Sequence, residues 1–157
     1  MFAIFAAFVA RCLLVMLFLP FSALDKVLNF NAAVGQAAKA VSNPTVARTL
    51  ILLGLAVEVF GSLAILAGTA DRLAAFVLAG YCGVTALLWK QFWREPDFRL
   101  RGESRGREMF WDFLKNFAVA GGFLMLAFGG DATGVTKFLH DPFASSHPYQ
   151  SGEAASQ

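Results

Sequence analysis

Charged residues are scarce in this chain. They make up 15% of its 157 residues, whereas hydrophobic residues make up 57%. A typical soluble domain has about 25% charged and about 45–50% apolar residues. The length suits a single domain. This balance excludes an ordinary water-soluble domain and favours an integral membrane protein.

Cysteine and histidine are also few. Cys12 and Cys82 fall in separate apolar runs with no CxxC spacing, which argues against a disulfide framework or a zinc site. We expect both to behave as small buried hydrophobes. His140 and His147 lie outside the apolar runs, so they form no pair of haem ligands in the membrane. Without a third ligand they make no metal site either, and we predict none.

Several motifs of catalysis and recognition are missing. The chain has no glycine-rich phosphate loop, no nucleophile elbow, no HExxH sequence and no internal repeat. Its one basic stretch, residues 94–108, holds five Arg and four acidic residues. That balance does not indicate nucleic-acid binding, and contact with anionic lipid headgroups suits these arginines better. We therefore expect no free-standing enzyme with a complete active site.

What the chain does have is four long apolar runs. A helix needs about 20 residues to cross a hydrocarbon core of about 30 Å. The runs lie at about residues 2–21, 44–66, 73–93 and 110–128. Asn43 and Pro44 suit the start of the second run, and Gly68 suits its end. The short turn after Gly68 makes the second and third runs an antiparallel hairpin, so the predicted fold is an all-α bundle of four transmembrane helices.

The remaining segments are more polar. Residues 24–41 have partial helical spacing of apolar side chains, which predicts an interfacial amphipathic helix between the first two spans, broken near Gly35. Residues 94–108 are expected to form a solvated loop. Residues 1–140 would thus form the transmembrane domain, and residues 141–157 a polar, disordered tail.

Lysine and arginine are unevenly distributed between the two ends of the predicted bundle. The side of the first and third loops carries Lys26, Lys39, Arg48, Lys90, Arg94, Arg99, Arg101, Arg105 and Arg107. The opposite side has Arg72 and Lys137. Cytoplasmic loops of membrane proteins carry the excess of Lys and Arg. We therefore expect loop 94–108 in the cytoplasm and both termini outside.

Two charged residues lie within the apolar runs. Arg11 interrupts the first run, which lacks a preceding basic segment and is therefore expected to be a retained helix and not a cleaved signal peptide. Glu58 lies near the middle of the second run, on a face shared with Gly54 and Gly61 that directs it into the bundle. A lone charge at such depth costs at least about 2.5–3.5 kcal/mol, so we predict an Arg11–Glu58 ion pair. Its role is either functional or limited to fixing helix register.

Further polar residues extend this predicted pair toward the cytoplasmic face. They are Asp25, Lys26, Lys115 and Asn116, which we expect to form a polar track through the bundle. Lys115 lies close enough to a helix end to snorkel to the interface and anchor the span instead. Aromatic residues near the same face are Trp89, Phe92, Trp93, Phe110 and Trp111. They are typical of an interfacial aromatic belt, with a quinone slot as the alternative.

Four sequence features together resemble a known family. They are Arg11 in the first span, VEVFGSLAILAG in the second, TADRLAAFVLA after the hairpin turn, and FLKNFAVAGGFLMLAFGG in the fourth span. The last of these is the most specific. Over about residues 8–132 the chain resembles the DoxX-like membrane proteins.

The resemblance implies a bacterial inner-membrane protein whose Arg11, Glu58, Lys115 and Asn116 match the family's polar pattern. A related subunit belongs to a thiosulfate:quinone oxidoreductase, and other members are linked to oxidative or thiol stress. The favoured function is a redox- or quinone-associated membrane subunit, with quinone as the one cofactor implied. The alternatives are a scaffold for a membrane or cytoplasmic redox partner, and a small-molecule permease that would act mainly as a homo-oligomer. The lipid bilayer is the surrounding medium in all three, and nucleic acid is a partner in none.

Overall fold

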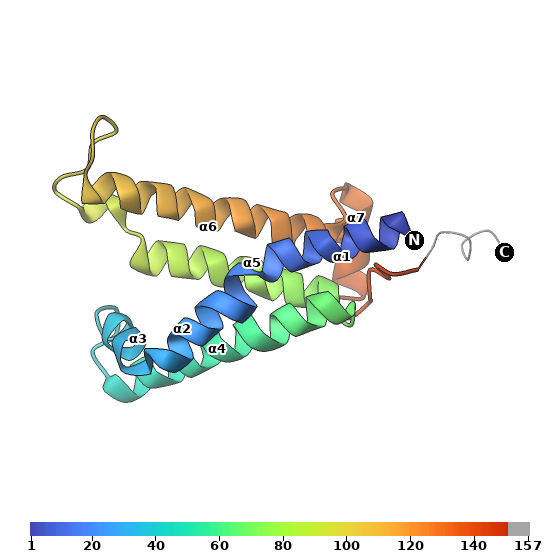
Figure 1. Ribbon diagram of the computed structural model, residues 1–157, viewed down its shortest axis with the longest axis horizontal. Helices are drawn as coiled ribbons and strands as arrows, with labels where there is room; N and C mark the ends of the chain where they lie inside the picture. The colour runs from blue at the N-terminus through green and yellow to red at the C-terminus, as the bar shows by residue number, and fades with distance from the viewer. Residues whose placement is uncertain (151–157) are drawn as a thin grey trace.

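The computed structural model describes residues 1–150, which contain helices and no strand. The elements in chain order are α1 (Phe2–Val15), the π-helical turn η1 (Leu17–Ser22), α2 (Ala23–Leu28), α3 (Phe30–Ala37), α4 (Pro44–Ala67), α5 (Asp71–Trp89), the 3₁₀ turn η2 (Phe92–Arg94), α6 (Arg105–Phe128) and α7 (Ala132–His140). Four helical stretches are long and apolar enough to cross a membrane. They lie side by side as a bundle, as predicted (Figure 1).

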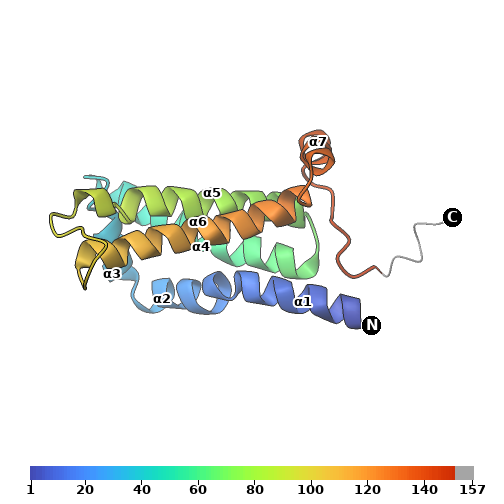
Figure 2. The ribbon, with the colours of Figure 1, turned by 90° about the horizontal axis from the view of Figure 1, so that it is seen from above.

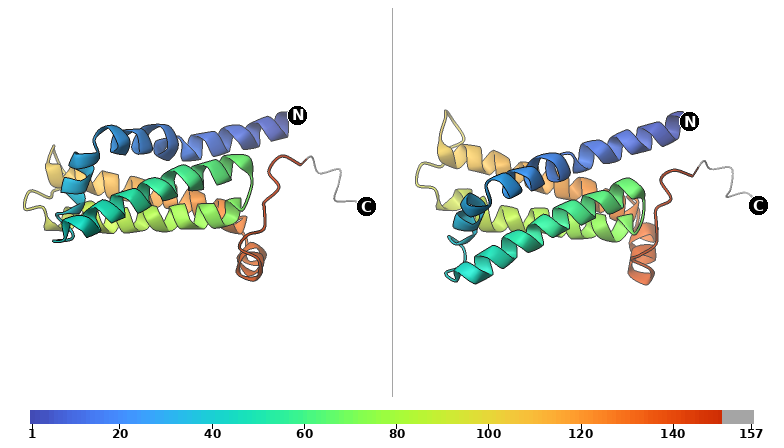
Figure 3. Two further views of the ribbon diagram at one scale, coloured as in Figure 1. Left: turned by 90° about the horizontal axis from the view of Figure 1, so that it is seen from below. Right: turned by 60° about the horizontal axis from the view of Figure 1, so that its bottom comes forward.

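The first span is longer than the sequence predicted. Elements α1, η1 and α2 run on as one helical stretch, Phe2–Leu28, so the predicted end near residue 21 is wrong. Pro20 lies in η1 and has no backbone N–H to donate. The π-helical turn accommodates it, and the helix changes direction between α1 and α2 (Figure 3). This extension moves the middle of the span away from Arg11.

The α4–α5 hairpin is confirmed, together with the signals that define it. The Asn43 side chain accepts hydrogen bonds from the backbone N–H groups of Thr45 and Val46, and Pro44 occupies the first turn of α4. Gly68 ends α4 with φ of 70°, a left-handed conformation that glycine adopts without strain. Helix α5 begins three residues later at Asp71, so this acidic side chain lies directly at the hairpin turn.

The polar segment between the first two spans differs from its prediction. The helix breaks at Asn29, whose φ of −115° and ψ of 37° are not helical, and continues through Gly35. Residues before Asn29 belong to the first span, and only α3 lies apart from it. Ala37 at the end of α3 is buried against Ala47 and Ile51 of α4. Helix α3 therefore packs on the start of α4 at the loop end of the bundle.

The third loop is shorter than predicted because α6 begins at Arg105 and not near residue 110. Two side chains bond to backbone N–H groups at this helix start: Asp97 accepts from Arg105 and Gly106, and Ser104 accepts from Arg107. An oxygen acceptor at these positions satisfies donors that a helix leaves free. The loop between α5 and α6 is thus fixed onto the first turn of α6.

Helix α7 has no counterpart in the sequence prediction. Asp131 caps its start, because the Asp131 side chain accepts a hydrogen bond from the Gly134 N–H. This hydrogen bond and a second one from the Thr133 hydroxyl hold the pKa of Asp131 below its usual range. Phe138 is buried and packs against Phe76 and Phe128. Helix α7 closes the end of the bundle opposite the basic loops (Figure 2).

The core lies where α5 and α6 meet the first span and the end of α4. Its buried residues are Val15, Phe18, Ile65, Ala75, Leu78, Ala79, Cys82, Ala120, Phe123 and Ala127. Many large apolar side chains face outward instead, among them Phe5, Leu53, Phe60 and Met125. Outward apolar faces are what helices surrounded by lipid require. Against this background the few buried charges define the candidate site.

Candidate functional site

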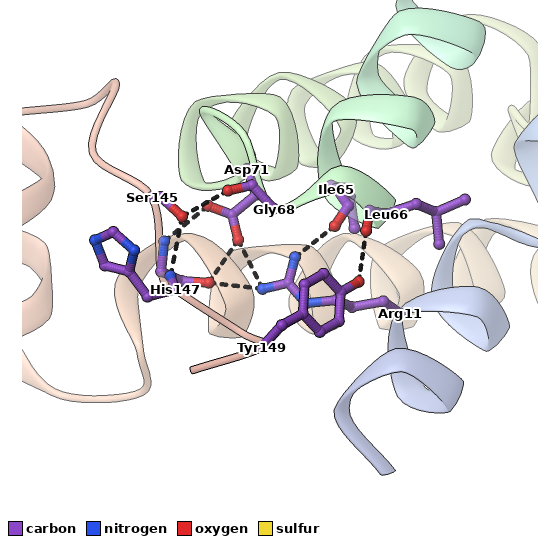
Figure 4. A network of polar contacts seen from close by, with 9 residues as sticks. Arg11, Ile65, Leu66, Gly68, Asp71, Ser145, His147 and Tyr149 are labelled. Carbon is purple, nitrogen blue, oxygen red and sulfur yellow. Dashed lines mark hydrogen bonds and ion pairs between the residues drawn. The ribbon is translucent and has the colours of Figure 1, made fainter. Parts of the chain in front are cut away.

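Arg11 forms the first of two buried charge pairs, and its partner is Asp71. The Arg11 Nη2 atom lies 2.6 Å from Asp71 Oδ2, and the side chains are 6% and 0% exposed. Arg11 Nη1 also donates to the Ile65 carbonyl at 2.6 Å. Both partners belong to the α4–α5 hairpin, so the pair ties the first span to the turn of that hairpin (Figure 4).

The segment after α7 covers this pair. The Ser146 backbone N–H donates to Asp71 Oδ1 at 2.9 Å, and the Ser146 hydroxyl bonds with Asp71 Oδ2. Nearby, the Ser145 and Tyr149 hydroxyls donate to the carbonyls of Gly68 and Leu66 (Figure 4). The predicted disordered tail is therefore wrong for residues 145–149, which dock on the hairpin turn. Residues 151–157 lie outside the described part of the chain.

This docking leads to a test on Ser146. Replacing Ser146 with alanine is expected to lower the free energy of unfolding by about 1–3 kcal/mol, because it removes bonding partners from buried charged groups. Denaturant unfolding of the purified protein in detergent measures the change. Ser42→Ala is the matched control, because Ser42 is exposed and its hydroxyl makes no bond in the described structure. Equal effects of the two variants would contradict the docked arrangement.

Glu58 forms the second buried pair, with Lys26 of α2. The Lys26 Nζ atom lies 2.7 Å from Glu58 Oε1, and the side chains are 16% and 1% exposed. The Ser22 hydroxyl donates to the same Glu58 oxygen at 2.9 Å and accepts from Lys26 Nζ at 2.6 Å. Glu58 points into the bundle as predicted, but toward the loop-end half of the first span.

The predicted Arg11–Glu58 pair is thus wrong, and helix length is the reason. Because the first span continues to Leu28, its middle moves to about residue 15, one helical turn beyond Arg11. Arg11 is level with Ile65, whereas Glu58 lies about two turns earlier on α4, or about 11 Å along the helix. The bundle thus contains two charge pairs at different levels along its length.

The Lys26–Glu58 pair has unused hydrogen-bonding capacity. Glu58 Oε2 and the Ser62 hydroxyl, one turn further along α4, are buried without a hydrogen-bond partner among the described residues. On the other side of Glu58, the Tyr81 ring of α5 lies so close to Gly54 that a Cβ there would be 3.1 Å from Tyr81 Oη. Such unpaired buried polar atoms are uncommon and call for an explanation. We name the group Ser22, Lys26, Glu58, Ser62 and Tyr81 the glutamate site.

The other residues of the predicted polar track do not reach the glutamate site. Asp25 is exposed and accepts a hydrogen bond from Asn29. Lys115 is 74% exposed and lies 3.4 Å from Asp112 on its own helix, and Asn116 donates to the Asp112 carbonyl. Of the track, the structure brings only Lys26 to Glu58. Within residues 1–150 no group of three His, Cys, Asp or Glu side chains is placed to hold a metal ion.

The comparison with known families decides the identity of the chain. A family model described as DoxX matches residues 6–91, more than half of the chain. The chain belongs to the DoxX family. With four helices of membrane-spanning length and composition, this DoxX protein is a multi-pass membrane protein. Neither a curated protein nor a solved structure matches it.

The DoxX match includes both buried charge pairs but leaves out part of the sequence pattern that resembled the family. Residues 6–91 include Arg11 with Asp71 and Lys26 with Glu58. The fourth-span sequence that contributed most to the resemblance lies beyond residue 91. The DoxX match therefore covers the glutamate site and leaves Lys115 and Asn116 outside it.

Sequence reasoning missed five residues of these two sites: Ser22, Ser62, Asp71, Tyr81 and Ser146. One signal was present for Ser22, which precedes Lys26 by four residues and so shares its helix face. Asp71 had a signal too, since it is an acid beside the hairpin turn that two spans share. Ser62 and Tyr81 gave none, because serine and tyrosine are ordinary in membrane helices.

Proposed function

We propose that this DoxX protein is a quinone-associated membrane subunit of a redox system, and that the glutamate site binds the quinone headgroup. The observation that supports this most is the buried Glu58 Oε2, which has no partner although Oε1 of the same carboxylate has two. An oxygen in this position is an acceptor for a ligand hydroxyl. In this proposal the electron transfer itself belongs to a partner protein, because the sequence has no motif of a redox cofactor or a nucleophile.

The chemistry of the donors fits such a ligand. A quinol has hydroxyl groups that donate, and a quinone has carbonyl groups that accept. Glu58 Oε2 can accept from the former, while the third N–H of the Lys26 ammonium and the unpaired Ser62 hydroxyl can donate to the latter. Hydrogen bonds to an ionised group are stronger than those between neutral groups, so Lys26 and Glu58 would supply most of the polar affinity for the ligand.

Aromatic side chains beside the glutamate site also suit a ring-shaped ligand. Phe18 and Tyr81 lie edge to face, with ring centroids 6.5 Å apart. Phe18 contacts Phe123 as well, at a centroid distance of 5.5 Å. Aromatic rings favour edge-to-face and offset contacts with one another. A quinone ring next to Glu58 would find such partners on the first span and on α5.

The arrangement of charges supports a bacterial inner-membrane location with the basic loops in the cytoplasm. The segment after α2 and the loop after α5 lie at one end of the bundle, and the N-terminus and α7 lie toward the other (Figure 1). Lys and Arg are in excess at the loop end, as is typical of cytoplasmic sides. In this orientation the glutamate site is the more cytoplasmic of the two charge pairs.

Binding of a short-chain ubiquinone to the purified protein tests the proposal. Glu58→Gln is expected to weaken binding by about tenfold or more, because a hydrogen bond to a charged group contributes about 1.5–3 kcal/mol. Lys115→Gln is the control, because it also removes one charge from a span but lies away from the glutamate site. If the wild type bound no quinone, or if both variants bound as the wild type does, the proposal would fail and a scaffold role would take its place.

A further inference from the structure

A polar cavity of about 740 Å³ lies at the loop end of the bundle, outside the glutamate site. It is bordered by the segment after α3, the end of α5 with η2, and the start of α6. The lining residues that matter are Lys39, Trp89, Lys90, Arg94, Arg105 and Glu108. We call it the loop-end pocket. Its volume lies within the range of about 300–1,000 Å³ that is usual for small-molecule sites.

Trp89, which lines this pocket, carries an unsatisfied donor. The indole Nε1 of Trp89 is buried and has no hydrogen-bond partner among the described residues. An indole N–H can only donate, so an acceptor is what this atom requires. The Trp89 ring also packs against the small cluster of Ala37, Ala47 and Ile51, which fixes its position between α5 and the start of α4.

The charges around the loop-end pocket leave an excess of positive charge. Two of its three acids are matched: Asp112 lies 2.9 Å from Lys90, and Glu95 lies 3.9 Å from Arg105. Lys39, Arg94 and Glu108 form no ion pair within the described part of the chain. Two unmatched cations against one unmatched acid favour a bound anion.

We propose that the loop-end pocket binds the phosphate group of an anionic phospholipid. A phosphate offers several acceptor oxygens, which match the Trp89 N–H and the Lys39 and Arg94 cations. The pocket lies where membrane-spanning helices end, and Leu88 and Met109 in its lining give apolar contact for the start of an acyl chain. Basic pockets between membrane helices on the cytoplasmic side commonly bind such headgroups. None of its lining residues belongs to the glutamate site, so the two proposals are independent.

Native mass spectrometry of the full chain in detergent, titrated with phosphatidylglycerol and with phosphatidylcholine, tests the charge preference. The wild type is expected to bind phosphatidylglycerol about tenfold or more tightly than phosphatidylcholine. Lys39→Gln with Arg94→Gln is expected to remove this preference. Arg99→Gln with Arg101→Gln is the matched control, because it removes the same charge from the exposed part of the loop. A preference that survives the first double variant, or that disappears equally in both, would overturn the proposal.

A second measurement distinguishes a lipid from a soluble phosphate and does not depend on the charge variants. The chain has three tryptophans, so Trp93→Phe with Trp111→Phe leaves Trp89 as the single reporter. Brominated phosphatidylglycerol is expected to quench the Trp89 fluorescence more strongly than brominated phosphatidylcholine does. Glycerol 3-phosphate at millimolar concentration is expected to leave that quenching unchanged. Equal quenching by the two lipids, or full competition by glycerol 3-phosphate, would overturn the assignment to a phospholipid.

Discussion

Replacing Asp71 with alanine is expected to lower the free energy of unfolding by about 3–5 kcal/mol. The substitution leaves the guanidinium of Arg11 inside the bundle without its counter-charge, at a site where its side chain is 6% exposed. It also removes the acceptor that holds Ser146, so the segment after α7 would lose its main attachment. Denaturant unfolding in detergent and protease sensitivity of the C-terminal segment measure the two effects.

A double variant shows whether the loss comes from the unpaired charge. Arg11→Met with Asp71→Leu removes both charges, and replacing a whole buried pair by apolar residues is often close to neutral. We therefore expect the double variant to be more stable than Asp71→Ala. Asp25→Ala is the control carboxylate, exposed and expected to change stability by about 0.5 kcal/mol or less. If Asp71→Ala and Asp25→Ala behaved alike, the buried Arg11–Asp71 pair would be contradicted.

The second large effect is expected at Lys26 and Glu58. Lys26→Met leaves the Glu58 carboxylate, 1% exposed, without its cation, and should cost about 3–5 kcal/mol of stability. Removing both charges, in Lys26→Met with Glu58→Gln, should cost less than the sum of the two single changes. A double-mutant cycle on unfolding free energies should therefore give a coupling energy of about 1–3 kcal/mol.

The same experiment with Arg11 in place of Lys26 distinguishes the observed pairing from the one that the sequence suggested. Arg11→Met and Glu58→Gln should be additive to within about 0.5 kcal/mol, because the two side chains share no partner. A coupling energy above about 1 kcal/mol in this cycle, with little in the Lys26 cycle, would restore the direct Arg11–Glu58 pair and contradict the structure.

The sequence predicted the helices well because their signals are local. An apolar run of sufficient length indicates a span, and Asn43, Pro44 and Gly68 act on the backbone within a few residues of themselves. The end of the first span was harder to predict from the sequence. Lys26 and Asp25 are charged, yet α2 continues past both, because Lys26 finds Glu58 inside the bundle and Asp25 faces outward. Charged residues therefore did not mark the end of the first helical stretch.

The ion-pair partners of Arg11 and Glu58 could not be predicted from the sequence, because they depend on how far each helix extends. Pairing Arg11 with Glu58 assumed that both lay at mid-span, and that assumption failed when the first helix proved longer. Asp71 was no candidate because an acid in the first turn of a helix is ordinary. Ser146 contacts Asp71, which lies 75 positions earlier in the sequence, and no periodic pattern indicates such a contact.

The two charge pairs differ in how completely their hydrogen bonds are used. Both Asp71 oxygens have partners in the structure, from Arg11 and Ser146. Glu58 has one oxygen with two partners and one with none. A fully bonded pair is suited to holding helices together, whereas a half-bonded one retains an acceptor for a ligand. This difference is the reason for assigning structure to the Arg11–Asp71 pair and ligand binding to the glutamate site.

The most direct test is the quinone content of the protein purified from native membranes in mild detergent, measured by mass spectrometry. Wild type, Glu58→Gln and Asp71→Asn are compared, each as folded protein recovered by size exclusion. We expect quinone in the wild type and in Asp71→Asn, and a loss of most of the quinone in Glu58→Gln. Quinone retained in Glu58→Gln, or lost to the same extent in Asp71→Asn, would contradict it.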